Sequence, residues 1–61
     1  MRLKELRESK GLTQKQVADV IGYSALSYAR YEKGEREPDI ATLKKLADYF
    51  DVSVDYIIGR K

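Results

Sequence analysis

The side chains that usually carry out catalysis or bind metals are missing or scattered in this 61-residue sequence. It contains no histidine and no cysteine, which excludes Ser–His–Asp triads, thiolate nucleophiles, disulfides and the usual zinc sites. Carboxylates are plentiful, but Asp48, Asp51 and Asp55 fall near helix ends or on exposed faces and suggest no acid–base pair or metal cage. There is no glycine-rich phosphate loop of the G-x-x-x-x-G-K-[ST] type. We therefore expect no enzymatic activity, no metal and no cofactor.

Cations and hydroxyl groups remain, and their chemistry is the binding of phosphate and of base edges. The net charge is +2 and the pI is near 9.0, which permits a nucleic-acid partner without requiring one. Residues 1–15 contain five basic residues (two Arg, three Lys) and two glutamates, and the charges of the remaining residues nearly cancel. A phosphate-binding protein with this sequence must therefore place a few cations and backbone amides well, because it has no broad basic field.

The elements that must position these groups are five short helices separated by glycine and proline. We expect them over about 2–10, 14–21, 25–33, 40–50 and 54–58. The second helix begins with a capping-box pattern, Thr13 followed by Gln16. The last three helices have candidate N-caps in Ser24, Asp39 and Ser53. The fourth is the best patterned, and its predicted core face consists of Ile40, Leu43, Leu46, Ala47 and Phe50.

No stretch alternates apolar and polar residues in the manner of a β-strand, so the predicted fold class is all-α, with five helices in one compact body. The length allows one domain, which we place at 1–61. No apolar run approaches the roughly 20 residues of a membrane span, and no signal-peptide pattern follows Met1. We expect no membrane association and a cytoplasmic location.

Residues 14–33 have the spacing of a helix-turn-helix unit. Ala18 is small where two helices would cross, and Gly22 supplies the positive φ for a tight turn. Tyr28 and Tyr31 are spaced to face back toward the first helix of the pair. In such a unit the second helix projects side chains into the major groove of DNA. An ordinary αα-hairpin is the alternative, and these twenty residues favour DNA binding only modestly.

Several further motifs in register resemble the Cro/cI (Xre-type) helix-turn-helix regulators, relatives of the lambda-type phage repressors. The resemblance extends from Leu3 to Gly59. It rests on these segments: Leu12-Thr13-Gln14, Val17-Ala18, Ile21-Gly22-Tyr23-Ser24, Tyr31-Glu32-Lys33-Gly34, Arg36-Glu37-Pro38, Leu43-Lys44-Lys45-Leu46-Ala47 and 52–59. It implies a five-helix, lambda-repressor-like domain that binds operator DNA, usually as a two-fold dimer.

The resemblance also implies roles for particular residues. Gln14, Lys33 and Arg36 would contact backbone phosphates, with Gln14 helped by the dipole of its helix. The reading surface of the third helix would comprise Ser24, Ala25, Leu26, Ser27 and Arg30. Arg30 is the candidate base reader, because a guanidinium can clasp guanine O6 and N7. Its alternative roles are a phosphate contact or a surface ion pair.

Ala25 and Leu26 depart from the polar residues that many members of this family carry where the helix opens. Two explanations compete. Leu26 turns inward as part of the core, or the third helix reads a thymine-rich or shape-defined site with few direct hydrogen bonds.

Two further assignments concern structure and assembly. The resemblance implies that Arg7 pairs with Glu32, tying the first helix to the end of the third. Tyr56 and Ile58 are expected to stay exposed and to form the self-complementary patch of a homodimer.

The sequence thus predicts a transcriptional regulator, most simply a repressor, that binds a pseudo-palindromic duplex operator. The alternative is a protein-interaction module, such as an antitoxin or adaptor domain, on the same helical scaffold. The apolar residues Val20, Ala25, Leu26 and Ile58 support that alternative.

Overall fold

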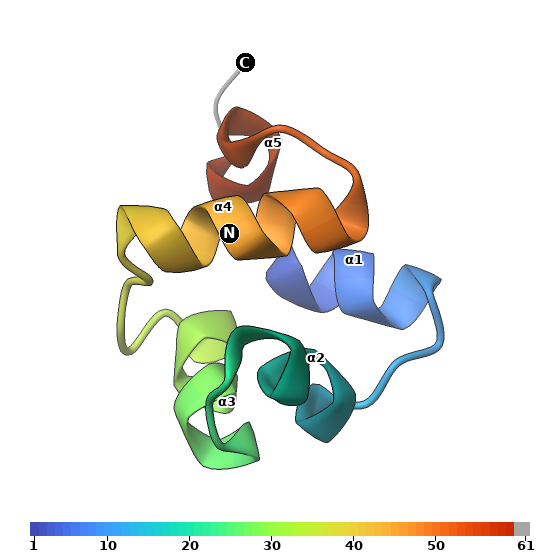
Figure 1. The fold of residues 1–61 in the computed structure, drawn as a ribbon, viewed down its shortest axis with the longest axis vertical. Helices are drawn as coiled ribbons and strands as arrows, with labels where there is room; N and C mark the ends of the chain where they lie inside the picture. The colour runs from blue at the N-terminus through green and yellow to red at the C-terminus, as the bar shows by residue number, and fades with distance from the viewer. Residues whose placement is uncertain (60–61) are drawn as a thin grey trace.

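The computed structural model describes residues 1–59 and consists, over that range, of five α-helices joined by short connections (Figure 1). These are α1 (Leu3–Ser9), α2 (Gln14–Ile21), α3 (Ala25–Lys33), α4 (Ile40–Phe50) and α5 (Val54–Ile58). The predicted all-α fold class is confirmed. Only α1 is shorter than the sequence pattern predicts, by one residue at each end.

The helix starts follow from local side-chain chemistry. At α2 the Thr13 hydroxyl accepts from the Gln16 backbone N–H at 3.1 Å, and the Gln16 side-chain oxygen accepts from the Thr13 N–H at 2.8 Å. This reciprocal pair satisfies two backbone donors at the helix N-terminus. The predicted N-caps of the last three helices, Ser24, Asp39 and Ser53, all accept a backbone hydrogen bond.

The helices enclose one core, with α4 across the middle of the molecule (Figure 1). α2 and α3 lie below α4 in that view, α1 lies to one side, and α5 lies on the opposite side of α4 from α2 and α3. Fully buried side chains come from every helix, and the largest are Leu3, Val17, Tyr28, Leu46 and Ile57. Each helix is too short to be stable alone in water, so this shared burial holds it in place.

The prediction that Ile40 belongs to the core is wrong. Ile40 is 71% exposed, whereas the other four residues assigned to that face of α4 are buried. The buried face is centred nearer to Thr42, which is 5% exposed and whose hydroxyl lies 3.3 Å from the Tyr23 hydroxyl. Because successive helical residues are rotated by about 100°, this centring leaves Ile40 at the edge of the buried face, in the first turn of the helix.

None of the helices within residues 1–59 is long and apolar enough to cross a membrane.

Candidate nucleic-acid interface

One side of α3 is locked into the core and the other faces solvent. Tyr28 is fully buried and Tyr31 is 5% exposed, whereas Leu26 on the opposite side is 66% exposed. Arg30 and Lys33 share that outward face and are also exposed. The alternative in which Leu26 packs into the core is therefore wrong. The aromatic rings fix the rotation of the helix, and that rotation presents Leu26, Arg30 and Lys33 together.

The turn before α3 sets how the helix projects from the body. Gly22 ends α2 in the left-handed conformation with φ of 76°. The Tyr23 N–H then donates to the Ala18 carbonyl at 2.9 Å, which closes the turn. Ala18 is fully buried, and α2 packs directly against α3. This is the helix–turn–helix arrangement that the spacing of residues 14–33 predicts.

One flank of α3 meets the N-terminus of α2 through a network around Glu32. The Arg7 Nε donates to Glu32 Oε2 at 2.6 Å, and the Arg7 Nη2 donates to Glu32 Oε1 at 3.1 Å. The third nitrogen of the guanidinium, Nη1, donates to the Leu12 carbonyl at 2.9 Å. Gln14 completes the network, because its Nε2 donates to Glu32 Oε1 at 3.1 Å. The structure thus joins α1, α2 and α3 through one buried carboxylate.

This network changes the titration of its members. Burial by itself raises the pKa of Glu32, but the hydrogen bonds from Arg7, the nearby Tyr28 hydroxyl and the bond from Gln14 outweigh it, so that the pKa of Glu32 lies below its ordinary value. The hydrogen bond to Glu32 raises the pKa of Arg7. Burial raises the pKa of Tyr28, and the adjacent Glu32 carboxylate raises it further. At neutral pH the Arg7–Glu32 pair is therefore fully ionised.

Gln14 has a more constrained position than the sequence pattern indicates. One of its amide hydrogens is engaged by Glu32, which leaves the second hydrogen for an external anion, together with the backbone N–H groups of Gln14 and Lys15 that the capping box does not use. Lys15, which follows it, pairs with Asp19 at 2.7 Å on the exposed surface of α2.

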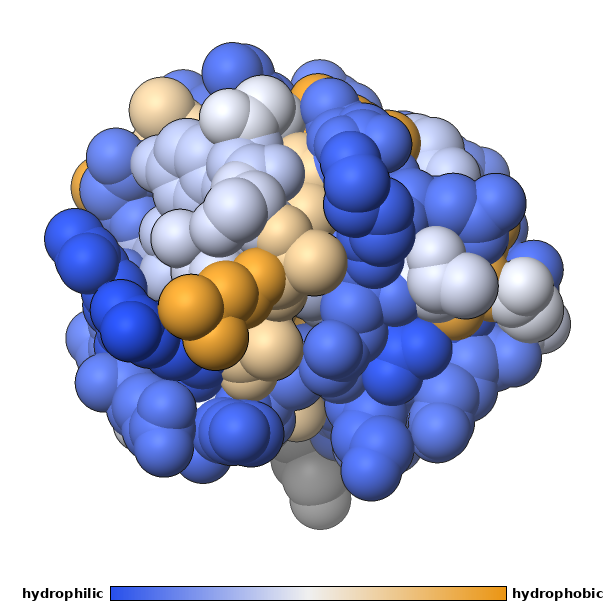
Figure 2. All heavy atoms as spheres, turned by 90° about the horizontal axis from the view of Figure 1, so that it is seen from below, coloured by the Kyte–Doolittle hydropathy of each residue, from blue (hydrophilic) through white to orange (hydrophobic). Residues whose placement is uncertain are grey.

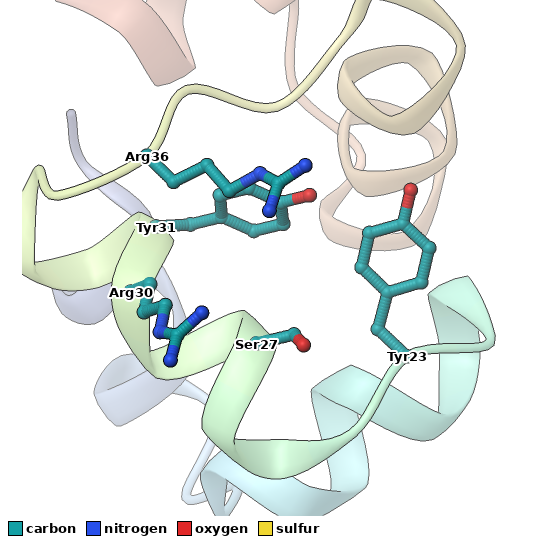
Figure 3. A pocket seen from close by; sticks show the side chains of 5 residues that line it. All are labelled: Tyr23, Ser27, Arg30, Tyr31 and Arg36. Carbon is teal, nitrogen blue, oxygen red and sulfur yellow. The ribbon is translucent and has the colours of Figure 1, made fainter.

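The other flank of α3 borders a pocket of about 220 Å³ between α3, the α2–α3 turn and the α3–α4 connection (Figure 3). Five residues line it: Tyr23, Ser27, Arg30, Tyr31 and Arg36. The sequence pattern assigns Tyr31 to the core only. Nothing in the local pattern shows that the connection after α3 brings Arg36 back beside this side chain.

The two predicted serines at the start of α3 are tied to each other. Ser24 accepts from the Ser27 backbone N–H at 3.1 Å as the N-cap, and its hydroxyl donates to the Ser27 hydroxyl at 3.0 Å. Ser24 is thus occupied as a cap, while Ser27 lines the pocket. Ala25 between them is half-buried.

Apolar side chains interrupt the polar surface around the helix-turn-helix. Figure 2, seen from the side on which α2 and α3 lie, shows a small hydrophobic area enclosed by hydrophilic atoms. Among the exposed apolar side chains of these helices are Leu26 and Val20, the latter 41% exposed. Exposed apolar side chains in a polar setting can contact thymine methyl groups or a partner protein.

The candidate dimer residues lie on α5, away from α3 (Figure 1). Tyr56 is 45% exposed and Ile58 is 36% exposed. Arg2 holds this end of the molecule together, because its backbone N–H donates to the Ile57 carbonyl at 2.7 Å and its guanidinium lies 4.5 Å from the centre of the Tyr56 ring. Arg2 therefore covers part of the Tyr56 ring, although Tyr56 remains more exposed than Ile58.

Comparison with known proteins identifies the same arrangement elsewhere. A family model described as helix-turn-helix matches residues 3–57. The chain is 44% identical over 57 residues to the SPbeta prophage-derived HTH-type transcriptional regulator YonR of Bacillus subtilis, covering 93% of this chain and 53% of the relative. It is also 44% identical over 59 residues to the cryptic phage CTXphi transcriptional repressor RstR of Vibrio cholerae, covering 97% of this chain and 53% of the relative.

Among solved structures, a transcriptional regulator from Listeria innocua matches with a TM-score of 0.93 at 35% identity, over 98% of this chain and 56% of that one. The chain thus spans about half the length of the relatives that it matches.

Proposed function

The chain belongs to the Cro/cI-type helix-turn-helix family of transcriptional regulators, and from that premise we propose that it binds double-stranded DNA and represses transcription. The observation that carries the proposal is the orientation of α3. Tyr28 and Tyr31 hold one side in the core, and Leu26, Arg30 and Lys33 face solvent on the other. A helix held in this way can enter the major groove, which is about 12 Å wide.

Arg30 is the proposed base reader. Its exposed guanidinium can donate two parallel hydrogen bonds to guanine O6 and N7. Leu26, one helical turn earlier on the same face, offers an isobutyl group that can contact a thymine methyl. Ala25 lies beside Leu26 at the start of α3. Together these two residues favour a DNA site in which thymines lie next to the guanine that Arg30 contacts.

Phosphate contacts would fix the register of the helix. On one flank, Gln14 has a free amide hydrogen beside the backbone N–H groups at the start of α2. Lys33 follows the reading face at the end of α3, and Arg36 lies beyond it in the connection to α4. Because Ser24 caps α3 and donates to Ser27, the Ser27 hydroxyl is the one of the two that supplies a phosphate contact at the start of α3. These contacts position the protein and carry no sequence information directly.

The proposed assembly is a two-fold dimer through Tyr56 and Ile58, which lie on α5 and leave α3 of each copy free. Two copies of α3 would then meet a pseudo-palindromic operator whose half-sites are about 34 Å apart, one turn of DNA.

The apolar residues favour one alternative function, a protein-interaction module of the antitoxin or adaptor kind. Leu26, Val20 and Ile58 are all exposed and could contact a partner protein. Salt separates the two functions: binding through several phosphates weakens steeply with the logarithm of salt concentration, whereas an apolar protein interface hardly responds.

The test is selection of bound duplexes from a random pool, followed by titration of the selected duplex with Arg30→Ala. We expect this variant to lose about 1–3 kcal/mol of discrimination at one base pair and to keep its preferences elsewhere. Lys4→Ala is the matched control, since it removes an exposed cation on α1 outside the proposed interface. Retention of the complete sequence preference by Arg30→Ala would overturn the docking orientation.

A further inference from the structure

The buried carboxylate of Glu32 reaches from the core to the first side chain of α2. Its Oε1 accepts from Gln14 Nε2 at 3.1 Å, between residues that lie 18 positions apart in the sequence. The Glu32 side chain is 4% exposed, whereas Gln14 is half-buried at the surface. A side chain fixed in the interior therefore holds one that borders the proposed interface.

The charge of Glu32 determines which end of the Gln14 amide lies against it. An ionised carboxylate only accepts hydrogen bonds, so the amide nitrogen, and not the amide oxygen, must face Glu32. The second hydrogen on that nitrogen then remains for a ligand outside the protein. A glutamine without such a neighbour can present either its oxygen or its nitrogen, and the oxygen would repel an anion.

Glu32 adds little repulsion of its own toward an anion near Gln14. Arg7 donates to both carboxylate oxygens, at 2.6 and 3.1 Å, so the pair carries no net charge. The Arg7 guanidinium is itself fixed, because its Nη1 donates to the Leu12 carbonyl at 2.9 Å. The Arg7–Glu32 pair thus offers Gln14 a rigid acceptor without excess negative charge.

We propose that Glu32 is a positioning residue for DNA binding, which orients the Gln14 amide so that its nitrogen meets a phosphate of the duplex. This role rests on the proposed function, in which Gln14 contacts the DNA backbone. Immobilising a long side chain at an interface typically costs about two- to tenfold in affinity. The bond to Glu32 orders Gln14 in the free chain and removes that cost from the binding step.

The test replaces the ion pair without leaving a buried charge. In Arg7→Met/Glu32→Met both charges are lost together, so the net charge of the chain stays at +2. Replacing a buried ion pair by apolar side chains of similar volume is often neutral or stabilising. We therefore expect this double variant to fold, which circular dichroism checks, while Gln14 loses the side chain that holds it.

Binding to the selected duplex is measured for a cycle that crosses Gln14→Ala with the double variant. Gln14→Ala should weaken binding about tenfold in the wild-type chain, the size of one charge-assisted hydrogen bond. In the double variant the same substitution should weaken binding by about threefold or less, because Gln14 is no longer positioned. The double variant alone should bind about three- to tenfold more weakly than the wild type. If Glu32 were only structural, Gln14→Ala would have the same effect in both backgrounds.

Arg36→Gln is the matched control in both backgrounds. Arg36 is exposed in the α3–α4 connection and borders the opposite flank of α3. Its substitution should weaken binding by the same factor with and without the ion pair, because distant sites act additively. If Arg36→Gln also loses its effect in the double variant, α3 has shifted as a whole, and the positioning role is overturned.

A second measurement follows Gln14 in the free chain. NMR relaxation of its side-chain amide should show an ordered Nε2 in the wild type and an order parameter below about 0.6 in the double variant. An amide that is equally mobile in both chains would overturn the positioning role. If the double variant does not fold, Glu32→Gln takes its place in both assays. This variant replaces one acceptor oxygen by a donor, and the effect of Gln14→Ala should again decrease.

The outcomes separate the positioning role from the proposed function. Duplex binding in which Gln14→Ala has no effect, or has the same effect in both backgrounds, overturns the positioning role and leaves DNA binding intact. If no duplex binds at all, the proposed function fails, and the positioning role fails with it.

Discussion

The Arg7–Glu32 pair has an asymmetry that makes a sharp stability prediction. Both partners are largely buried, with 13% of the Arg7 side chain and 4% of the Glu32 side chain exposed. Arg7→Met removes the two bonds to the carboxylate, and among residues 1–59 it leaves Glu32 with the Gln14 amide as a donor and the Tyr28 hydroxyl nearby. Glu32→Gln leaves Arg7 with its bond to the Leu12 carbonyl and with the more exposed side chain of the two.

The magnitudes follow from what each variant leaves behind. Removing one member of a buried pair typically costs about 3–5 kcal/mol, and a carboxylate that keeps one amide donor belongs near the lower end, about 3 kcal/mol. Glu32→Gln should cost about 1–2 kcal/mol, because Arg7 keeps a partner and can reach water. A chain of this length has a total free energy of unfolding of about 3–9 kcal/mol. Arg7→Met therefore removes a large part of the stability, and Glu32→Gln a smaller part.

The assay is a double-mutant cycle by urea unfolding at pH 7. The double variant Arg7→Met/Glu32→Gln should be more stable than Arg7→Met alone, because the neutral amide can remain buried beside Gln14 without a cationic partner. An unfolding free energy of Arg7→Met equal to or above that of the double variant would refute this reasoning. So would a larger loss for Glu32→Gln than for Arg7→Met.

Three other predictions follow from the same structure. Because the pKa of Glu32 is lowered in the folded chain, ionised Glu32 contributes to the free energy of unfolding above its unfolded-state pKa of about 4.3, and this contribution is lost as the pH falls through the folded-state value. The free energy of unfolding of the wild type should therefore decrease at pH values below about 4, and that of Glu32→Gln should decrease less over the same range. Gly22→Ala should destabilise the chain by about 1 kcal/mol in thermal unfolding, since a φ of 76° strains any residue with a Cβ although the space around it is open; a wild-type melting temperature would contradict this. Tyr56→Ser/Ile58→Ser should shift sedimentation toward the monomer, and a variant that sediments as a dimeric wild type does would place the interface elsewhere.

Local chemistry explains why the helices could be predicted closely from the sequence. A cap such as Ser24 and a stop such as Gly22 act within four residues of the chain, so their effect is visible without knowledge of the fold. The burial of Tyr28 and Tyr31 likewise follows from their spacing along α3. The family was recognisable for the same reason, since its motifs are short and in register.

The prediction that Ile40 is buried is wrong because packing between helices, and not the local sequence pattern, decides its exposure. Helical spacing places it at the edge of an apolar face, and the packing of α4 against its neighbours decides which edge is covered. The fate of Leu26 was open for the same reason: both the core and the exposed alternatives satisfied its sequence context. In the folded chain the buried tyrosines fix the rotation of α3 and expose it.

The sequence by itself determined the five helices, their caps and turns, and the membership of the family, because these depend on interactions between residues close together in the chain. Only the tertiary structure decided that Gln14 donates to Glu32 and that Arg36 returns beside Tyr31 to form a pocket. These contacts join residues from different elements, and the relative rotation of packed helices sets them. That rotation is a property of the whole core, so no local pattern specifies it.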